Sequence, residues 1–77
     1  MTREEFREMI AMGWTEEATL REWSHPQYGK FYHAENSGRW YLKRPHEYPQ
    51  QMGSGYSLRK AIDALVEATS QPEVKPA

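Results

Sequence analysis

The 77-residue sequence contains no cysteine, and this absence excludes disulfides, thiolate metal sites and cysteine nucleophiles. It also lacks any apolar run near the roughly 18 residues that a membrane-spanning helix requires. Its first residues, MTREEFREM, are too charged for a signal peptide. We therefore expect a cytoplasmic protein without a membrane partner. The length predicts one small globular domain over residues 1–69, followed by a flexible tail over residues 70–77.

The charged side chains are unevenly distributed, although the net charge is only −1. Residues 1–24 hold three basic and six acidic side chains, a local charge of −3. Residues 25–60 hold six basic and two acidic side chains, a local charge of +4, together with most of the aromatic residues. The middle of the chain is therefore basic and aromatic between acidic ends.

Helices are predicted at both ends of the domain. Thr2 and Glu5 form a capping-box pattern, and Phe6, Met9 and Ile10, which we expect in the core, follow at helical spacing. A helix is therefore expected over residues 3–12 with Gly13 as its stop. Ser57 is a typical cap for a second helix. The apolar stripe of that helix consists of Leu58, Ala61, Ile62, Leu65 and Val66.

A β-hairpin is predicted between the helices, because two aromatic-rich segments, 30–35 and 39–44, flank the loop Asn36-Ser37-Gly38. A two-residue loop would pair polar with apolar side chains. A three-residue loop with Gly38 in the left-handed conformation separates them by face. In that register the core side holds Tyr32, Ala34, Trp40 and Leu42, and the outward side holds Phe31, His33, Glu35, Arg39, Tyr41 and Lys43.

The remaining segments carry weaker patterns. Residues 14–24 favour a short helix or turn followed by extended chain, and residues 46–55 favour a turn-rich, mobile connection. The predicted fold class is therefore α+β. It consists of an N-terminal helix, a small two- to three-stranded antiparallel sheet with hairpin 30–44, and a C-terminal helix packed on the sheet.

The stretch WSHPQYGK (residues 23–30) resembles the synthetic streptavidin-binding peptide tags, which share its Trp-Ser-His-Pro-Gln run and its lysine. No Gly/Ser linker flanks it, and the neighbouring residues continue the local pattern. Pro26 and Gly29 are typical of a bend. We therefore interpret the stretch as a native corner that leads into the hairpin.

The sequence offers little for catalysis or metal binding. The three histidines, His25, His33 and His46, lack an acidic residue at a recognisable ligand spacing. His33 and Glu35 share a strand face and could form an acid–base pair or an ordinary hydrogen bond. Gly53-Ser54-Gly55 lacks the lysine of a phosphate-binding loop, although an anion could still bind where the following helix begins. We expect a protein that is not an enzyme and that uses no cofactor or metal.

The outward side of the hairpin is the predicted binding site, since it sets aromatic rings beside cations. Such a surface suits a protein interface, where Tyr, Trp and Arg dominate the binding energy, and it also suits base stacking with phosphate contacts. The overall isoelectric point near 6.3 favours a protein partner. The predicted site residues are Phe31, His33, Arg39, Tyr41, Lys43 and Arg44. The small size is also typical of accessory or regulatory proteins of phages and mobile elements.

Two resemblances to DNA-binding families bear on the alternative. Gly29-Lys30-Phe31, Gly38-Arg39-Trp40-Tyr41-Leu42 and Tyr56-Ser57-Leu58 together resemble the three-stranded domains of ethylene-response factors and integrase amino termini. This resemblance covers residues 29–65. It implies DNA contacts by Lys30, Arg39, Tyr41 and Lys43. The chain departs from the pattern in its long 45–55 insertion and in lacking a glycine after Leu42.

Thr19-Leu20-Arg21, followed by Gly38-Arg39-Trp40, is similar to the winged helix of excisionases and mercury-resistance-type regulators. This resemblance implies a DNA-reading helix over the segment around Thr19 and a wing at the hairpin. The acidic residues Glu16, Glu17 and Glu22 would then face phosphates, which opposes the electrostatic attraction of DNA binding.

Overall fold

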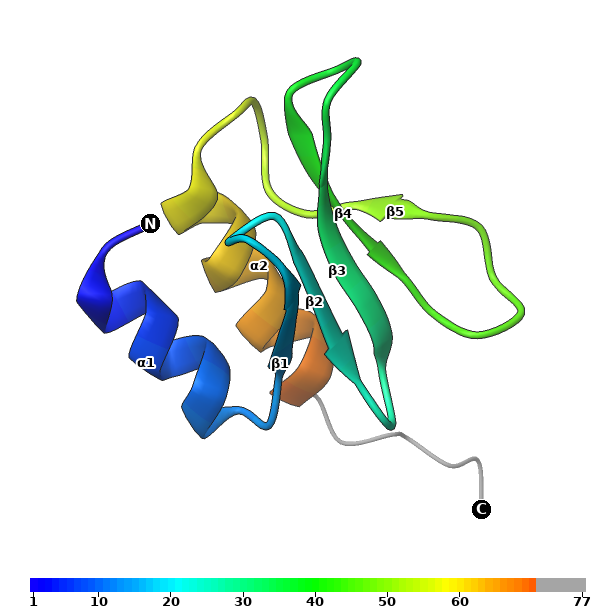
Figure 1. The fold of residues 1–77 in the computed structure, drawn as a ribbon. Coiled ribbons are helices and arrows are strands. Elements are labelled where there is room, and N and C mark those ends of the chain that lie inside the picture. The colour runs from blue at the N-terminus through cyan, green and yellow to red at the C-terminus, as the bar shows by residue number, and fades with distance from the viewer. Residues whose placement is uncertain (71–77) are drawn as a thin grey trace.

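The computed structural model describes residues 1–70, which form two helices and one five-stranded antiparallel sheet with strand order β1-β2-β3-β4-β5. In chain order the elements are α1 (Arg3–Ala11), β1 (Thr15–Ala18), β2 (Glu22–His25), β3 (Gly29–Ala34), β4 (Arg39–Lys43), β5 (Gln50–Gln51) and α2 (Leu58–Ser70). Both helices lie on the same side of the sheet (Figure 1). The α+β class is confirmed, but the predicted sheet of two to three strands was too small. The tail was predicted over residues 70–77; residue 70 is the last residue of α2, and residues 71–77 lie outside the described residues.

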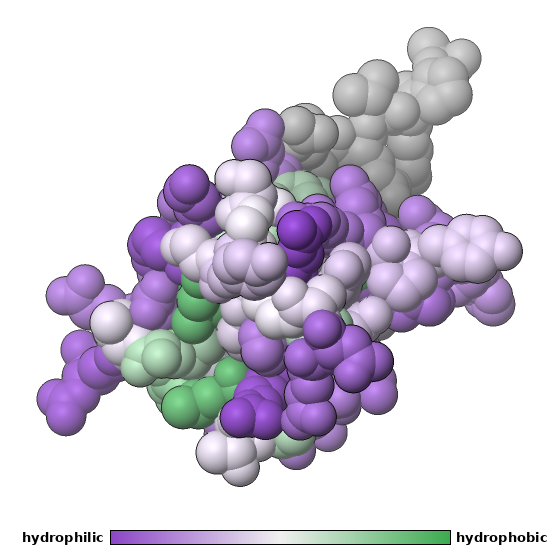
Figure 2. Space-filling view, turned by 90° about the horizontal axis from the view of Figure 1, so that it is seen from above, coloured by the Kyte–Doolittle hydropathy of each residue, from purple (hydrophilic) through white to green (hydrophobic). Residues whose placement is uncertain are grey.

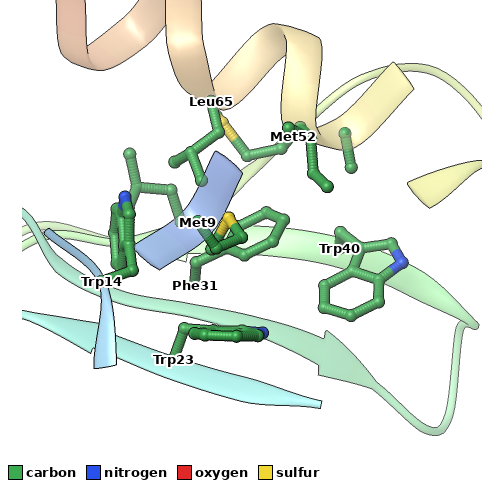
Figure 3. Packing of buried hydrophobic residues seen from close by; sticks show 10 residues of the cluster. Met9, Trp14, Trp23, Phe31, Trp40, Met52 and Leu65 are labelled. Carbon is green, nitrogen blue, oxygen red and sulfur yellow. The ribbon is translucent and has the colours of Figure 1, made fainter. Parts of the chain in front are cut away.

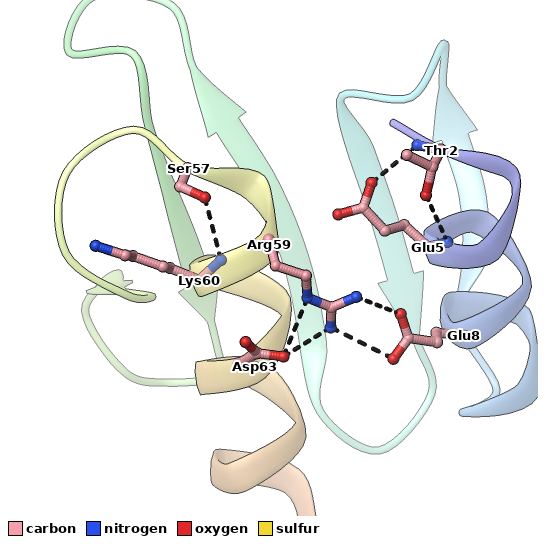
Figure 4. Close-up of polar contacts among 7 residues, drawn as sticks. All are labelled: Thr2, Glu5, Glu8, Ser57, Arg59, Lys60 and Asp63. Carbon is pink, nitrogen blue, oxygen red and sulfur yellow. Dashed lines mark hydrogen bonds and ion pairs between the residues drawn. The ribbon is translucent and has the colours of Figure 1, made fainter.

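Helix α1 begins with the predicted capping box. The Glu5 backbone N–H donates to Thr2 Oγ1 at 3.1 Å, and the Thr2 backbone N–H donates to Glu5 Oε1 at 2.8 Å (Figure 4). The bond from the Thr2 N–H lowers the pKa of the Glu5 carboxyl. The side chain of Glu5 is also buried. Two of the free donors at the helix start are thereby satisfied.

Replacing Glu5 with Gln is expected to weaken the acid dependence of the unfolding free energy. Because the folded-state pKa of Glu5 is lowered, its contribution is complete above the ordinary carboxyl pKa and is lost as the pH falls through the lowered value. Glutamine keeps an acceptor oxygen but has no charge to titrate. E5Q should therefore be less stable than the wild type at pH 7 and lose less stability on acidification to ~pH 3. Urea denaturation at both pH values measures this difference, and equal losses in the two proteins would contradict it.

Arg59 joins the two helices. Its guanidinium donates to both carboxylate oxygens of Glu8 in α1, at 2.6 and 3.3 Å, and to Asp63 one turn further along α2, at 2.7 and 3.2 Å (Figure 4). These bonds raise the pKa of the Arg59 guanidinium. The contact is exposed and therefore screened by salt, so it orients the helices more than it stabilises them.

Residues 14–24 contain two strands. The short helix or turn predicted at the start of this segment was wrong, because residues 15–18 form β1, whereas the extended chain predicted after it is confirmed by β2. Strands β1 and β2 pair antiparallel, with Thr15 opposite Ser24 and Glu16 opposite Trp23. Residues 19–21 form the turn between them, so they do not form the reading helix that the winged-helix resemblance implied. All four side chains of β1 are exposed, which removes the alternation by which a strand is normally recognised.

The hairpin of β3 and β4 is present, but its predicted register was wrong. Phe31 lies opposite Leu42, Tyr32 opposite Tyr41 and Ala34 opposite Arg39. The loop therefore has four residues, 35–38, and the Gly38 N–H donates to the Ala34 carbonyl at 2.7 Å. Gly38 does adopt the predicted left-handed conformation, with φ of +72°.

This register reverses the faces of strand β3. Phe31 is fully buried beside Trp40, with stacked ring centroids 5.0 Å apart. Tyr32 and Ala34, predicted in the core, lie on the opposite side of the sheet. For β4 the prediction is confirmed, because Trp40 and Leu42 are buried and Tyr41 between them is not.

The stretch WSHPQYGK forms the end of β2, the turn to β3 and the start of β3, so the corner interpretation is confirmed. Trp23 is fully buried. Both ring nitrogens of His25 are engaged. Nδ1 accepts from the Gln27 N–H at 3.0 Å, and Nε2 lies 3.2 Å from the Met12 carbonyl oxygen.

The core lies between the helices and the sheet (Figure 3). Its buried residues are Met9, Trp14, Trp23, Phe31, Trp40, Leu42, Met52, Ala61, Ile62 and Leu65. Phe6 packs edge-on against Trp23, whereas Ile10, predicted in the core, is 49% exposed. Met52 is an addition from the segment predicted to be mobile. Its N–H donates to the Trp40 carbonyl at 2.9 Å, which continues the pairing of β5 with β4.

Neither helix in the described part of the chain has the length and apolar character needed to cross a membrane. The surface seen from above is mostly hydrophilic, and its hydrophobic residues occupy a limited area (Figure 2).

Candidate interaction surface

The sheet has one face packed on the helices and one face that no helix of residues 1–70 covers (Figures 1 and 3). Because side chains alternate along a strand, the neighbours of the buried residues Trp23, Phe31, Trp40 and Leu42 point to the uncovered side. We call this side the outer sheet face. It comprises Glu22, Ser24, Lys30, Tyr32, Ala34, Arg39, Tyr41, Lys43 and Gln51.

Two tyrosines form the centre of the outer sheet face. Tyr32 and Tyr41 are direct cross-strand partners, and their rings stack with centroids 5.9 Å apart. Direct pairs of aromatic residues are among the stabilising contacts of antiparallel sheets. Both rings remain half-buried, so they offer a fixed apolar platform that a partner can cover without first ordering it.

Three cations surround the tyrosines. Lys30 lies 3.5 Å from Glu22, and the Lys43 ammonium donates to the Arg44 carbonyl at 2.8 Å. The Arg39 guanidinium donates to Gln51 Oε1 at 3.3 Å and sits 5.5 Å from the centroid of the Tyr56 ring. With one carboxylate among them, the outer sheet face carries two positive charges in excess.

The structure separates the six residues predicted as the binding site. Arg39, Tyr41 and Lys43 lie together on the outer sheet face. Phe31 and His33 lie on the opposite side, where Phe31 is buried and the His33 ring packs 5.0 Å from that of Trp40, so their predicted outward placement was wrong. Glu35, the proposed partner of His33, pairs with Arg21 at 3.1 Å.

Arg44, the sixth predicted residue, contacts helix α2. Its guanidinium donates to the Ala68 carbonyl at 3.2 Å, near the end of α2. A cation at a helix C-terminus is stabilised by the helix dipole and by the free carbonyls there. This contact fastens the end of β4 to α2.

Sequence reasoning did not place Tyr32 on the outer sheet face. The signal was present, since Tyr32 and Tyr41 are the residues that would face each other in a four-residue loop. The choice between registers depended on which aromatic of the pair Phe31 and Tyr32 entered the core. A phenolic oxygen is the more costly group to bury, and this favours Phe31.

An open pocket adjoins the outer sheet face. It has a volume of about 360 Å³ and is lined by Lys43, His46, Glu47 and Tyr48. Tyr48 is 93% exposed. The pocket lies in the connection between β4 and β5, which projects away from the helices (Figure 1).

The glycine-rich segment 53–55 and the histidines were the other candidates from the sequence, for anion and metal binding. The backbone of Gly53 lies against Lys60 and Ala61, and its φ of +74° makes it a tight structural turn before α2. Among the described residues no group of three or more His, Asp or Glu side chains has a geometry that could hold a metal ion.

Comparison of the chain with protein-family models, with curated proteins and with solved structures gives no match.

Proposed function

We propose that this protein is a small non-enzymatic binding or regulatory module that recognises a protein partner through the outer sheet face. The observation that supports this most strongly is the stacked pair Tyr32–Tyr41, uncovered and surrounded by Lys30, Arg39 and Lys43. Tyr and Arg are enriched among the residues that dominate protein interfaces. They lie here on β3 and β4, each of which is paired with a strand on both sides, and the two tyrosine rings are already stacked, so little side-chain freedom is lost on binding.

The arrangement of charge is consistent with this proposal. Glu22, opposite Tyr32, is the one carboxylate of the outer sheet face as defined, and the other acidic side chains of the N-terminal part lie on edge strand β1 and on α1. Charged side chains on an edge strand also discourage sheet-to-sheet aggregation, so β1 itself is a poor site for strand addition. The tyrosines are therefore the more favourable place for a partner.

Arg39→Ala and Tyr41→Ala are expected to weaken binding of the protein partner by at least tenfold each, because each removes a central contact. The partner is first captured from a lysate of the source organism with and without nuclease. Its affinity for each variant is then measured by surface plasmon resonance. Arg7→Ala, which removes an exposed arginine on α1, is the matched control and should bind like the wild type.

Capture that is equally strong for the wild type, Arg39→Ala and Tyr41→Ala would contradict the proposed surface. Circular dichroism of each variant must show the native fold, so that a loss of binding reports the surface.

Nucleic-acid binding is the second candidate, because stacked aromatic rings flanked by cations also suit single-stranded nucleic acid. Lys30, Arg39, Tyr41 and Lys43, the contacts implied by the three-stranded-sheet resemblance, all lie on the outer sheet face. Fluorescence anisotropy with labelled oligonucleotides at about 50 mM salt tests it, since electrostatic binding is strong there. Absence of binding under these conditions would remove this candidate.

A further inference from the structure

Two lysines on the outer sheet face stand directly opposite each other across neighbouring strands. Lys30 of β3 and Lys43 of β4 are register partners, one pair beyond Phe31 and Leu42. The β-carbons of such partners lie about 4.5–5.5 Å apart, and like charges in this position destabilise a sheet. Nothing in the packing of the core requires this pair, since both side chains point away from it.

Carboxylates of the protein offset only part of the repulsion between Lys30 and Lys43. Lys30 has a single exposed ion pair with Glu22, at 3.5 Å. Lys43 has no carboxylate partner among the described residues, and its ammonium donates to the Arg44 carbonyl. An anion placed between the two ammonium groups would gain two charge-assisted hydrogen bonds and would cancel their mutual repulsion.

We propose that the outer sheet face recognises an extended acidic protein segment, with a carboxylate of the segment bound between Lys30 and Lys43 and an apolar side chain two residues away on the Tyr32–Tyr41 pair. This inference rests on the proposed function and names the chemistry of the partner. The pocket beside Lys43 gives the acidic segment room to continue past the edge of the sheet.

The charge pattern decides between an acidic protein segment and other anionic partners. The cations are confined to β3 and β4, and towards β1 the surface becomes acidic at Glu22 and at Glu17, whose carboxylate accepts from the Ser24 hydroxyl at 2.7 Å. A nucleic-acid strand long enough to cross the whole sheet would meet these carboxylates. A second copy of this chain is also unsuitable, because its own outer sheet face would bring the same excess of positive charge.

One consequence can be tested without knowing the partner. A substitution that removes the repulsion between the two lysines should stabilise the free protein and weaken its binding of an anion. Lys43→Gln removes the repulsion and keeps a side chain that can donate to the Arg44 carbonyl. The thermal midpoint of the free protein should therefore rise by about 1–3 °C. Lys60→Gln, the same change at an exposed position of α2, should leave the midpoint within about 1 °C.

Binding is tested by NMR on the isotope-labelled full chain with two synthetic probes. One is the peptide acetyl-Ser-Glu-Ser-Leu-Ser-amide, in which the Glu and Leu side chains are two residues apart and share a face when the peptide is extended, and the other is its glutamine counterpart. We expect the glutamate peptide to shift amide resonances of residues 30–32 and 41–43. In Lys43→Gln its affinity should fall at least threefold, whereas Lys60→Gln should retain the wild-type affinity.

Equal shifts with the glutamate and glutamine peptides would overturn the carboxylate site and leave the proposed binding surface intact. Absence of shifts at residues 30–32 and 41–43 with the glutamate peptide at about 10 mM would also overturn the carboxylate site. The dissociation constant would then lie well above about 10 mM, which is too weak for specific recognition. Tighter binding of a single-stranded oligonucleotide, lost in Lys43→Gln, would assign the site to phosphate and reject the acidic protein segment. Failure of the proposed function itself would give a different result. In that case the Arg39→Ala and Tyr41→Ala variants would bind the partner from the lysate as strongly as the wild type does.

Discussion

Trp23→Ala is expected to lower the unfolding free energy by about 3–5 kcal/mol, the usual cost of removing a buried tryptophan. Trp23 has no exposed surface. It packs edge-on against Phe6 of α1 and lies opposite Phe31 in the sheet, so its ring joins α1 to the sheet (Figure 3). For a domain of this length the total stability is of the order of 5 kcal/mol. The variant should therefore be largely or partly unfolded at room temperature.

Urea denaturation followed by far-UV circular dichroism measures this loss. Trp23→Phe is the informative companion, because the Trp23 indole N–H has no hydrogen-bond partner in the described structure and none is lost on replacement. It should cost much less than Trp23→Ala. Tyr48→Ala removes a similar ring from an exposed position and should change the stability by less than about 0.5 kcal/mol. A Trp23→Ala variant as stable as Tyr48→Ala would contradict the packing described for α1.

Gly29→Ala is the second change with a large expected effect. Gly29 has a φ of +101°, and a β-carbon there would lie 2.2 Å from the Lys43 carbonyl oxygen and 3.1 Å from the Arg44 α-carbon. The backbone conformation alone costs of the order of 1–3 kcal/mol for alanine. The clash adds to this cost, because its partner is backbone and cannot rotate away. The start of β3 would have to separate from the end of β4.

Gly55→Ala is the matched control for Gly29→Ala. Gly55 also has a positive φ, +71°, but a β-carbon there would meet no atom within 4 Å. Its cost should be limited to the conformational term, about 1–2 kcal/mol. Urea denaturation of both variants should show the larger loss for Gly29→Ala. A larger loss for Gly55→Ala would contradict the close approach of β3 and β4.

The parts of the fold that the sequence predicted are those with strong local signals. The capping box of Thr2 and Glu5 marked α1, and the Ser57 cap with its apolar stripe marked α2. Local hydrogen bonds and helical periodicity determine both elements, so no knowledge of tertiary contacts was needed. Gly38 likewise marked the hairpin loop because its conformation favours glycine.

The parts that could not be predicted depend on contacts between distant residues. Strand β1 exposes all four of its side chains, and β5 contains only Gln50 and Gln51, so neither has a hydrophobic alternation. Their positions are decided by pairing with β2 and β4. Burial of Met52 follows from the same pairing of β5 and has no local signal.

The sequence predicted the aromatic and basic character of the candidate site, but only some of its residues. Arg39, Tyr41 and Lys43 were correctly placed on one outward face, because β4 alternates clearly between large apolar and polar side chains. In β3 four consecutive residues, Phe31 to Ala34, can each be accommodated on either face. A shift of one residue in the pairing exchanged Phe31 for Tyr32 at the centre of the surface.

The most direct test of the outer sheet face as the binding surface is hydroxyl-radical footprinting of the protein with and without its captured partner. Aromatic and aliphatic side chains lose reactivity when a partner covers them. We expect protection of Tyr32 and Tyr41, with unchanged reactivity of Ile10 on α1 and Leu20 in the β1–β2 turn, which are exposed on other parts of the molecule. Protection of Ile10 or Leu20 with Tyr32 and Tyr41 unchanged would contradict the proposed binding surface.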